Sequence, residues 1–210
     1  MSDESIEQLK SRITELETKN AALQSENNKL KIEFYSENLI EYISSGLIPR
    51  FKALLNEINY PINSFFSENS SEKGHTLLTF STVTNQFELV KFLLEEKQAD
   101  INKANKKDGW TALMYAVENK NYELVNYFLQ KNANINIVDE DGFNAVAIAI
   151  DTHNEEMVKL LLDKKPQVNN KEVVVSLLEM SENENIIKMI RNYYGVEIEE
   201  EEEETQNEAD

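Results

Sequence analysis

The stretch Asp108-Gly-Trp-Thr-Ala-Leu-Met-Tyr-Ala116 returns as Asp141-Gly-Phe-Asn-Ala-Val-Ala-Ile-Ala149, with the two glycines 33 residues apart. A looser third copy, Gly74-His-Thr-Leu-Leu-Thr-Phe-Ser81, precedes both. Each copy is followed by an apolar segment and then by Ala-Asp-Ile-Asn102, Ala-Asn-Ile-Asn136 or Pro-Gln-Val-Asn169. A period in the low thirties indicates stacked supersecondary units that bury their apolar faces against one another.

Each copy is predicted to hold a turn followed by two helices. Gly109 and Gly142 stand where the chain turns sharply, at φ angles that a Cβ would penalise. Thr111 is placed to cap the helix that follows. In the second helix, apolar residues recur at three- and four-residue spacing and form one stripe. These residues are Leu124, Val125, Phe128 and Leu129 in one copy, and Met157, Val158, Leu161 and Leu162 in the next.

The array extends weakly in both directions. Upstream, the segments 39–46 and 51–55 suggest a divergent first unit, and downstream the segments 172–178 and 186–190 suggest a closing helix pair. Terminal units of such arrays are atypical because one face meets water. The expected domain covers residues 36–195 with about five helix pairs: repeats near 37–70, 71–105, 106–138 and 139–170, and a cap at 171–195.

These repeats resemble the ankyrin family, whose signature is Gly-x-Thr-Pro-Leu-His-x-Ala. The glycine is matched by Gly74, Gly109 and Gly142, the threonine by Thr76 and Thr111, and the leucine by Leu78, Leu113 and Val146. The proline is replaced by Leu77, Ala112 and Ala145, and the histidine by Thr79, Met114 and Ala147. The resemblance implies an all-α solenoid with β-turn fingers, and a protein partner bound by the fingers and first helices.

A heptad pattern occupies residues 1–35, before the repeats. Apolar residues and two asparagines fill the a and d positions: Ile6, Leu9, Ile13, Leu16, Asn20, Leu23, Asn27, Leu30 and Phe34. Leucine at every d position and a buried Asn at a positions favour two parallel strands in register. The flanking pairs Arg12–Glu17 and Glu26–Lys31 would attract across a parallel dimer. We expect a parallel homodimer through residues 6–34. The alternative is a single solvated amphipathic helix that folds back on the repeats or pairs with another protein.

The charge distribution bears on the kind of partner. The chain carries a formal charge of −18, and nine of its acidic residues lie in the segment 196–210 without a basic one. Such a block is expected to be a disordered acidic tail. No Lys/Arg-rich helix precedes the heptads, as a DNA-binding zipper requires. We therefore expect no binding to nucleic acid.

The chain lacks the residues that several classes of function require. The chain has no cysteine and only two histidines, and no glycine-rich phosphate loop is present. Carboxylates are abundant but show no acid–base constellation, so we expect no enzyme activity, no cofactor and no metal. No apolar span is long enough for a membrane helix, and the N-terminus lacks a signal-peptide pattern. The expected location is the cytoplasm, with nuclear entry left open.

The resemblance places candidate partner-binding residues at the fingers and at the ends of the first helices. An aromatic follows every turn glycine: His75, Trp110 and Phe143. These rings either form an exposed ridge or pack between neighbouring fingers. The other candidates are Lys107, Asp108, Glu118, Asn119, Glu140, Asp141 and Asp151.

The pattern as a whole predicts a non-catalytic adaptor that the zipper dimerises and that binds a protein through the ankyrin groove. Two alternatives remain: a regulator that occludes one enzyme or transcription factor, and a chaperone that holds basic proteins with the acidic tail.

Overall fold

The computed structural model describes residues 3–166, 175, 178–179 and 181–195. The chain divides into two compact units, Met1–Ala116 and Val117–Asp210. Across the described residues, no helix is long and apolar enough to cross a membrane. The acidic segment 196–210 and most of the predicted helix at 172–178 lie outside the described residues.

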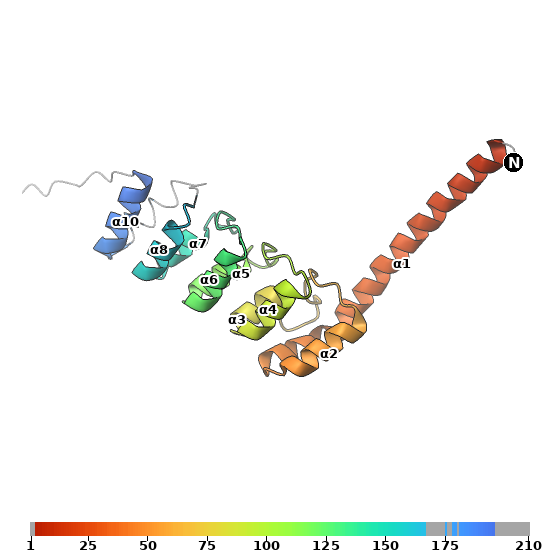
Figure 1. The fold of residues 1–210 in the computed structure, drawn as a ribbon, viewed down its shortest axis with the longest axis horizontal. Coiled ribbons are helices and arrows are strands. Elements are labelled where there is room, and N and C mark those ends of the chain that lie inside the picture. Colours follow the sequence, from red (N-terminus) through yellow and green to blue (C-terminus); the bar gives the residue numbers. More distant parts are fainter. Residues whose placement is uncertain (1–2, 167–174, 176–177, 180, 196–210) are drawn as a thin grey trace, which may run out of the picture. The chain divides into compact units, whose positions relative to one another are not determined.

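The first unit begins with one long helix, α1 (Asp3–Ser44), which packs against α2 (Ile48–Ile58). The N-terminal part of α1 extends away from α2, whereas its C-terminal part lies beside it (Figure 1). The predicted boundary between zipper and solenoid at residues 35 and 36 therefore falls within a continuous helix. Leu39, Ile43, Phe51 and Leu55 form the buried core where α1 meets α2.

A glycine ends α1. Gly46 has φ +65°, its N–H donates to the Ile43 carbonyl at 3.1 Å, and the Leu47 N–H donates to the Tyr42 carbonyl at 2.8 Å. This pair of bonds is a Schellman motif, which satisfies carbonyls at a helix end. Pro49 then lies in the first turn of α2, where its missing N–H costs nothing.

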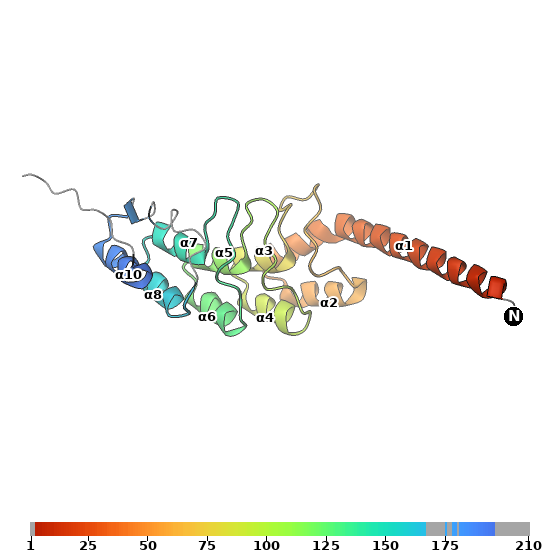
Figure 2. The same ribbon diagram turned by 90° about the horizontal axis from the view of Figure 1, so that it is seen from above.

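The next helices of the first unit are short. The pair α3 (Leu77–Val83) and α4 (Phe87–Glu95) packs together, and α5 (Ala112–Glu118) follows. Leu77, Leu78, Leu89 and Leu93 are buried between α3 and α4. In Figure 2, the loops before α3 and before α5 project in the same direction. Phe65 and Thr76 form an isolated antiparallel bridge at the base of the first of these loops.

The second unit repeats this plan. Its elements are α6 (Tyr122–Gln130), the pair α7 (Ala145–Asp151) and α8 (Glu155–Leu162), and α10 (Glu184–Tyr194), which packs on α8. The helix α10 contains the second half of the predicted closing pair. The apolar stripe predicted for the second helices is confirmed. Leu124, Val125 and Phe128 are buried on α6, where Leu129 is half-buried, and Met157, Val158, Leu161 and Leu162 are buried on α8.

The turns predicted at Gly109 and Gly142 and the cap predicted at Thr111 are confirmed, and the structure shows equivalent features at Gly74, Thr76 and Asn144. Gly74, Gly109 and Gly142 have φ angles of +88°, +77° and +86°. At the start of α3, the Thr76 hydroxyl accepts a hydrogen bond from the Thr79 N–H at 3.1 Å. At α5, Thr111 accepts from the Met114 N–H at 3.4 Å. At α7, the Asn144 side chain accepts from two backbone N–H groups at 3.0 Å. The departures from the signature therefore leave the helix starts capped.

Candidate functional site

The heptad residues of α1 form an exposed apolar stripe. Leu16 is 51% exposed, Leu23 65% and Phe34 74%, and Ile13 and Leu30 are exposed to a similar degree. Asn20 and Asn27 are exposed on the same helix. The side chains of Ile6 and Leu9 lie outside the described residues. Isolated exposed apolar residues are ordinary, but apolar residues repeated at heptad spacing along one helix face are typical of a surface that another molecule covers.

The other face of α1 packs on the rest of the first unit. Ser36, Leu39 and Ile43 have no exposed surface. With 3.6 residues per turn, these three positions lie roughly opposite the line from Leu23 to Phe34. The helix therefore uses one face to hold the repeats and leaves the heptad face uncovered.

Charges along α1 pair within the helix. The Glu15 carboxylate contacts Lys19 Nζ at 2.9 Å and an Arg12 guanidinium nitrogen at 2.6 Å. Hydrogen bonds from Lys19 and then from Arg12 lower the pKa of Glu15. Arg12, which was predicted to contact Glu17 of a second copy, is thus bonded to Glu15 in the single chain. These are exposed pairs, and each contributes little to stability.

In the first unit, two of the predicted finger aromatics, His75 and Trp110, both pack against the ring of Tyr115. The His75 and Tyr115 ring centroids lie 5.4 Å apart, and those of Trp110 and Tyr115 lie 5.2 Å apart. Both predicted residues are half-buried. Tyr115 thus joins them into one aromatic cluster on the fingers. The sequence reasoning missed Tyr115, although a tyrosine inside the short helix between Met114 and Ala116 was a signal for it.

The Tyr115 hydroxyl also anchors the finger before α5. It donates to the Asp108 carboxylate at 3.2 Å and accepts a hydrogen bond from the Asn105 side-chain amide. Burial, followed by the negative charge of Asp108 and the hydrogen bond to it, raises the pKa of Tyr115. The side-chain oxygen of Asn105, Oδ1, accepts hydrogen bonds from the Lys107 and Asp108 N–H groups at 3.0 and 3.1 Å. Asp108 is therefore part of the finger scaffold, while the Lys107 side chain is exposed.

His75 is partly withdrawn from solvent. Its Nδ1 lies 3.3 Å from the Thr79 hydroxyl. Burial lowers the pKa of His75. The negative charge of the nearby Asp108 acts to raise this pKa, and the positive charge of Lys107 acts to lower it further. A neutral imidazole is therefore the favoured form in the folded chain at neutral pH.

In the second unit, the finger before α7 has a similar scaffold. The Asp139 carboxylate accepts from the Phe143 N–H at 2.8 Å and from the Asp141 N–H at 3.0 Å. Phe143 is half-buried. The remaining candidates at the finger and at the ends of α5 and α7 are exposed: Glu118, Asn119, Glu140, Asp141 and Asp151.

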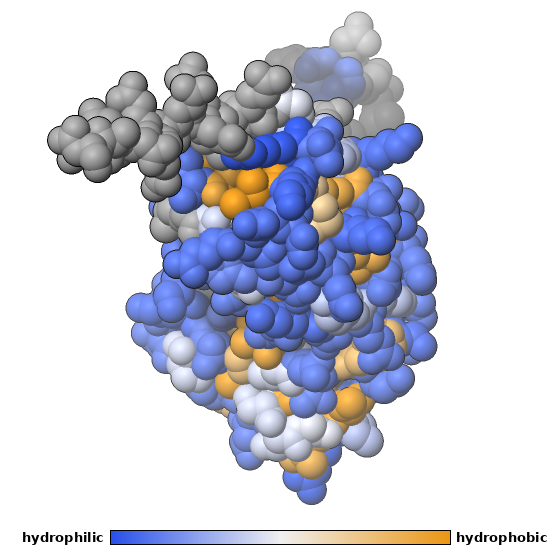
Figure 3. All heavy atoms as spheres, turned by 90° about the vertical axis from the view of Figure 1, so that its left-hand side faces the viewer, coloured by the Kyte–Doolittle hydropathy of each residue, from blue (hydrophilic) through white to orange (hydrophobic). Residues whose placement is uncertain are grey.

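Side chains suited to metal binding do not converge in the described part of the chain. Within it, no group of three His, Asp or Glu residues is placed to hold a metal ion. The face in Figure 3 is mainly hydrophilic, and its hydrophobic patches are small and separated by polar side chains. The row of exposed apolar residues on α1, interrupted only by Asn20 and Asn27 between Ile13 and Phe34, differs from that pattern.

The comparisons with known proteins address the repeats. A family model described as ankyrin repeats (3 copies) matches residues 39–139 and 98–173. The chain belongs to the ankyrin-repeat family. Its fold is an all-α ankyrin-repeat solenoid preceded by the long helix α1. Membership in this family implies a role in protein–protein interaction.

Among the curated relatives, a 64-residue part of the chain is 45% identical to ankyrin repeat and SAM domain-containing protein 6 of Rattus norvegicus, covering 30% of this chain and 7% of that protein. Alpha-latrocrustotoxin-Lt1a of Latrodectus tredecimguttatus is 32% identical over 38% of this chain and 6% of its own length. The putative ankyrin repeat protein FPV034 of Fowlpox virus (strain NVSL) is 28% identical over 42% and 29%. The matched region thus spans under a third of each of these relatives.

Proposed function

We propose that this ankyrin-repeat protein is a non-catalytic, cytoplasmic adaptor that forms a parallel homodimer through α1 and binds a protein partner through its fingers and first helices. The observation that carries this proposal is the exposed stripe on α1, which faces away from the repeats. If the chain's own repeats covered the stripe, a second copy could not bind it. Along its described length the stripe is uncovered.

The energetics support a reversible dimer. Burying an apolar side chain fully contributes about 1.5–3 kcal/mol, and the side chains of Ile13, Leu16, Leu23, Leu30 and Phe34 are each more than half exposed. Two such helices therefore gain on the order of 10 kcal/mol on pairing. Association costs about 4–15 kcal/mol. The balance predicts a dimer whose population depends on concentration and falls sharply when the stripe is interrupted.

Acidic residues mark the C-terminal end of the stripe. After Phe34, the next d and a positions are Glu37 and Glu41. In a parallel dimer these would place like charges opposite each other, which is unfavourable. The zipper therefore ends near Phe34, before α1 packs against α2. Because α1 packs on the rest of the first unit with its opposite face, pairing through the stripe would leave that packing intact.

Dimerisation would give the adaptor two copies of its finger surface. Two linked sites bind a multivalent partner more tightly than one, because the second contact forms within the complex. The candidates at this surface are the half-buried rings of His75, Trp110 and Phe143 and the exposed charges around them. We infer that the rings fix the shape of the fingers and that the exposed charges select the partner.

The direct test of the finger surface is charge reversal at exposed positions. A variant with Lys107→Glu, Glu118→Lys and Glu140→Lys is compared with the unaltered chain in quantitative affinity capture, followed by binding measurements with each purified captured protein. We expect affinity for the authentic partner to fall about tenfold or more. None of the three side chains forms part of the finger scaffold, so the fold is expected to survive.

The matched control carries the same changes on second helices and beyond: Glu57→Lys, Glu156→Lys and Lys164→Glu. All three residues are exposed, and the change in net charge is identical. Equal loss of binding in both variants would show a general charge effect and contradict the finger surface. Retention of full affinity in the finger variant would contradict it as well.

A further inference from the structure

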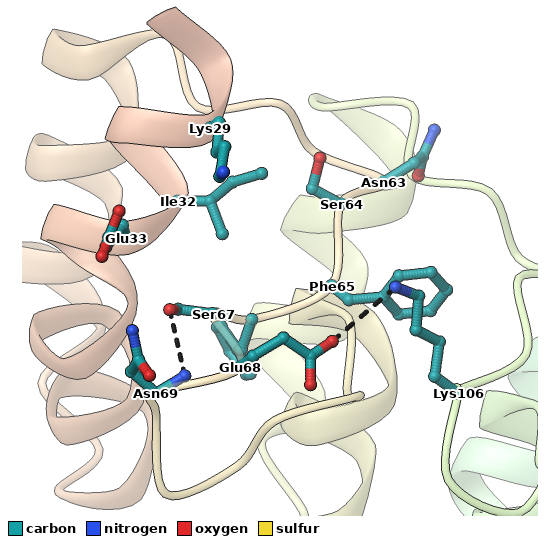
Figure 4. Close-up of a pocket in the computed structure, with 11 residues that line it drawn as sticks. Lys29, Ile32, Glu33, Asn63, Ser64, Phe65, Ser67, Glu68, Asn69 and Lys106 are labelled. Carbon is teal, nitrogen blue, oxygen red and sulfur yellow. Dashed lines mark hydrogen bonds and ion pairs between the residues drawn. The ribbon is translucent and has the colours of Figure 1, made fainter. Parts of the chain in front are cut away.

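A cleft of about 640 Å³ lies in the first unit between α1 and the loop that leads to α3. Ile32 projects from α1 toward this loop, and Phe65 lies on the opposite side, beside Lys106 (Figure 4). Lys29 reaches into the same space from the preceding turn of the helix. The cleft is separate from the heptad stripe, because Lys29 and Ile32 lie on the repeat-facing side of α1.

Two hydrogen bonds fix the width of the cleft by tying the loop to α1. The Ser67 N–H donates to the buried Ser36 hydroxyl at 3.0 Å, and the Ser71 N–H donates to the Glu37 carboxylate at 2.9 Å. On the loop side, the Phe66 N–H donates to the His75 carbonyl at 2.8 Å. The walls are therefore held in place before any ligand arrives, which lowers the entropic cost of binding.

Basic side chains surround the apolar wall. Lys106 Nζ lies 4.8 Å and Lys103 Nζ 5.1 Å from the centroid of the Phe65 ring. Lys106 also contacts Glu68 at 3.8 Å, but the Glu68 side chain is 74% exposed and that pair is weak. Within the described part of the chain, the Lys29 ammonium has no ion-pair partner. Glu33 is the other acidic residue of the lining. It lies on the far side of Ile32, away from Ser64 and Phe65 (Figure 4).

Two uncharged polar groups of the lining also lack partners. Among the described residues, the Ser64 hydroxyl and the Asn69 side-chain amide form no hydrogen bond. Both line the cleft, Ser64 near its upper end and Asn69 near its lower end in Figure 4. A ligand could thus gain hydrogen bonds without breaking any that the fold uses. A small apolar wall with convergent polar groups is typical of a binding site.

We infer that this cleft is a second docking site, and that its ligand is a short acidic segment of a partner protein carrying one large apolar side chain. The apolar side chain packs against Ile32 and Phe65. The carboxylates of the segment meet Lys29 and Lys106, and Lys103 reinforces the positive charge beside Phe65.

The net charge of the chain does not oppose this assignment. At physiological ionic strength, charges more than about 8 Å apart are largely screened. A bound carboxylate therefore responds mainly to Lys29, Lys103 and Lys106, and only weakly to acidic residues elsewhere. The lining also holds two acidic residues, Glu33 and Glu68. Glu33 lies on the far side of Ile32 from Phe65 (Figure 4), and a ligand carboxylate would replace Glu68 beside Lys106.

The test uses fluorescence anisotropy with three short fluorescein-labelled peptides and the intact chain. One peptide has the core Glu-Leu-Phe-Glu, the second has Lys-Leu-Phe-Lys and the third has Glu-Ser-Ser-Glu. We expect the first to bind most tightly and to lose affinity as salt rises. The double variant Lys29→Glu and Lys106→Glu should weaken it about tenfold or more, and Ser64→Trp, which fills the cleft, should abolish binding.

The matched control is Lys164→Glu with Lys165→Glu, two exposed lysines of the second unit. It should bind the first peptide as the unaltered chain does. Circular dichroism establishes that Ser64→Trp folds, and the charge variant gives an independent answer if it does not. Leu16→Glu with Leu23→Glu, which interrupts the zipper stripe, should leave peptide affinity unchanged and so separates this site from dimerisation.

Two kinds of result would overturn the assignment of the cleft. Equal binding of all three peptides, or unchanged affinity in the Lys29 and Lys106 variant, would overturn the cleft as an acidic-peptide site. A peptide of residues 196–210 that binds more tightly than Glu-Leu-Phe-Glu, and is lost in the same variants, would assign the cleft to the chain's own acidic segment and overturn the assignment to a partner.

Discussion

Phe34 and Ser36 are two residues apart on α1 and face opposite environments: the Phe34 side chain is 74% exposed, whereas Ser36 is completely buried. One helix therefore carries an exposed apolar face and a buried face that packs on the rest of the first unit. This arrangement joins the two parts of the proposed adaptor rigidly, because no break separates the heptads from the first repeat.

The buried Ser36 hydroxyl should be needed for the loop of the first unit. It accepts from the Ser67 N–H at 3.0 Å and donates to the Ile32 carbonyl at 2.5 Å. Ser36→Ala removes the acceptor and should cost about 1–3 kcal/mol of unfolding free energy, measured by urea denaturation. Ser25→Ala, at an exposed site on the same helix, should have little effect. An equally small change for Ser36→Ala would show that the loop is not held through this bond.

Gly74 should be more sensitive to alanine than Gly195. Gly74 has φ +88° and a Cβ there would make only ordinary contacts at 3.6 Å with Lys106 and Lys107. The cost of Gly74→Ala therefore comes from the backbone and should be about 1–2 kcal/mol. Gly195, at φ +62° and with no neighbouring atom within 4 Å of the position that a Cβ would take, lies close to the left-handed region that other residues visit, and should lose less. The urea midpoints of the two variants decide between these expectations.

Tyr115→Phe should loosen the finger before α5. The change leaves the Asn105 amide without the acceptor it uses, and Asn105 is only 4% exposed. The loss should be about 1 kcal/mol in unfolding free energy. Hydrogen exchange should show faster exchange of the Lys107 and Asp108 amides, which bond to Asn105. Unchanged exchange there would show that the finger is held without the hydroxyl.

His75 should make stability depend on pH. Burial lowers the pKa of His75 below its ordinary value of 6.5, so the unfolded chain binds the proton more readily than the folded chain. The stabilisation is present above about pH 6.5 and is lost as pH falls through the folded pKa. His75→Asn should reduce the loss of thermal stability between about pH 7 and pH 5, compared with His153→Asn at an exposed site. Identical pH profiles for the two variants would contradict this role.

The local features of the repeats could be predicted from the sequence because each depends on few residues. Gly109 and Gly142 adopt positive φ angles and Thr111 caps a helix, as predicted. Gly74 and Thr76, which match the same signature positions, do the same in the first copy. The stripes on the second helices follow from the spacing of their apolar residues, because other packings would expose these side chains to water. Such signals lie within a few neighbouring residues.

Other features depend on contacts between distant segments. The cleft needs Ile32 of α1, Phe65 of a loop without a repeat pattern and Lys106 of the next finger, and no local spacing links these three. Tyr115 was overlooked because its role depends on rings 5 and 40 positions earlier in the chain. The partner-binding residues remain predictions, because the shape of a repeat surface does not identify its ligand.

The exposed face of α1 is proposed to pair with the same face of a second copy. Sedimentation equilibrium of the intact chain should give a concentration-dependent dimer, and Leu16→Glu with Leu23→Glu should give a monomer. The control Ala22→Glu with Ser25→Glu adds the same charge to α1 outside the a and d positions, and should stay dimeric. A monomer at every concentration for the unaltered chain, or equal dimerisation of the Leu16 and Leu23 variant, would contradict the claim.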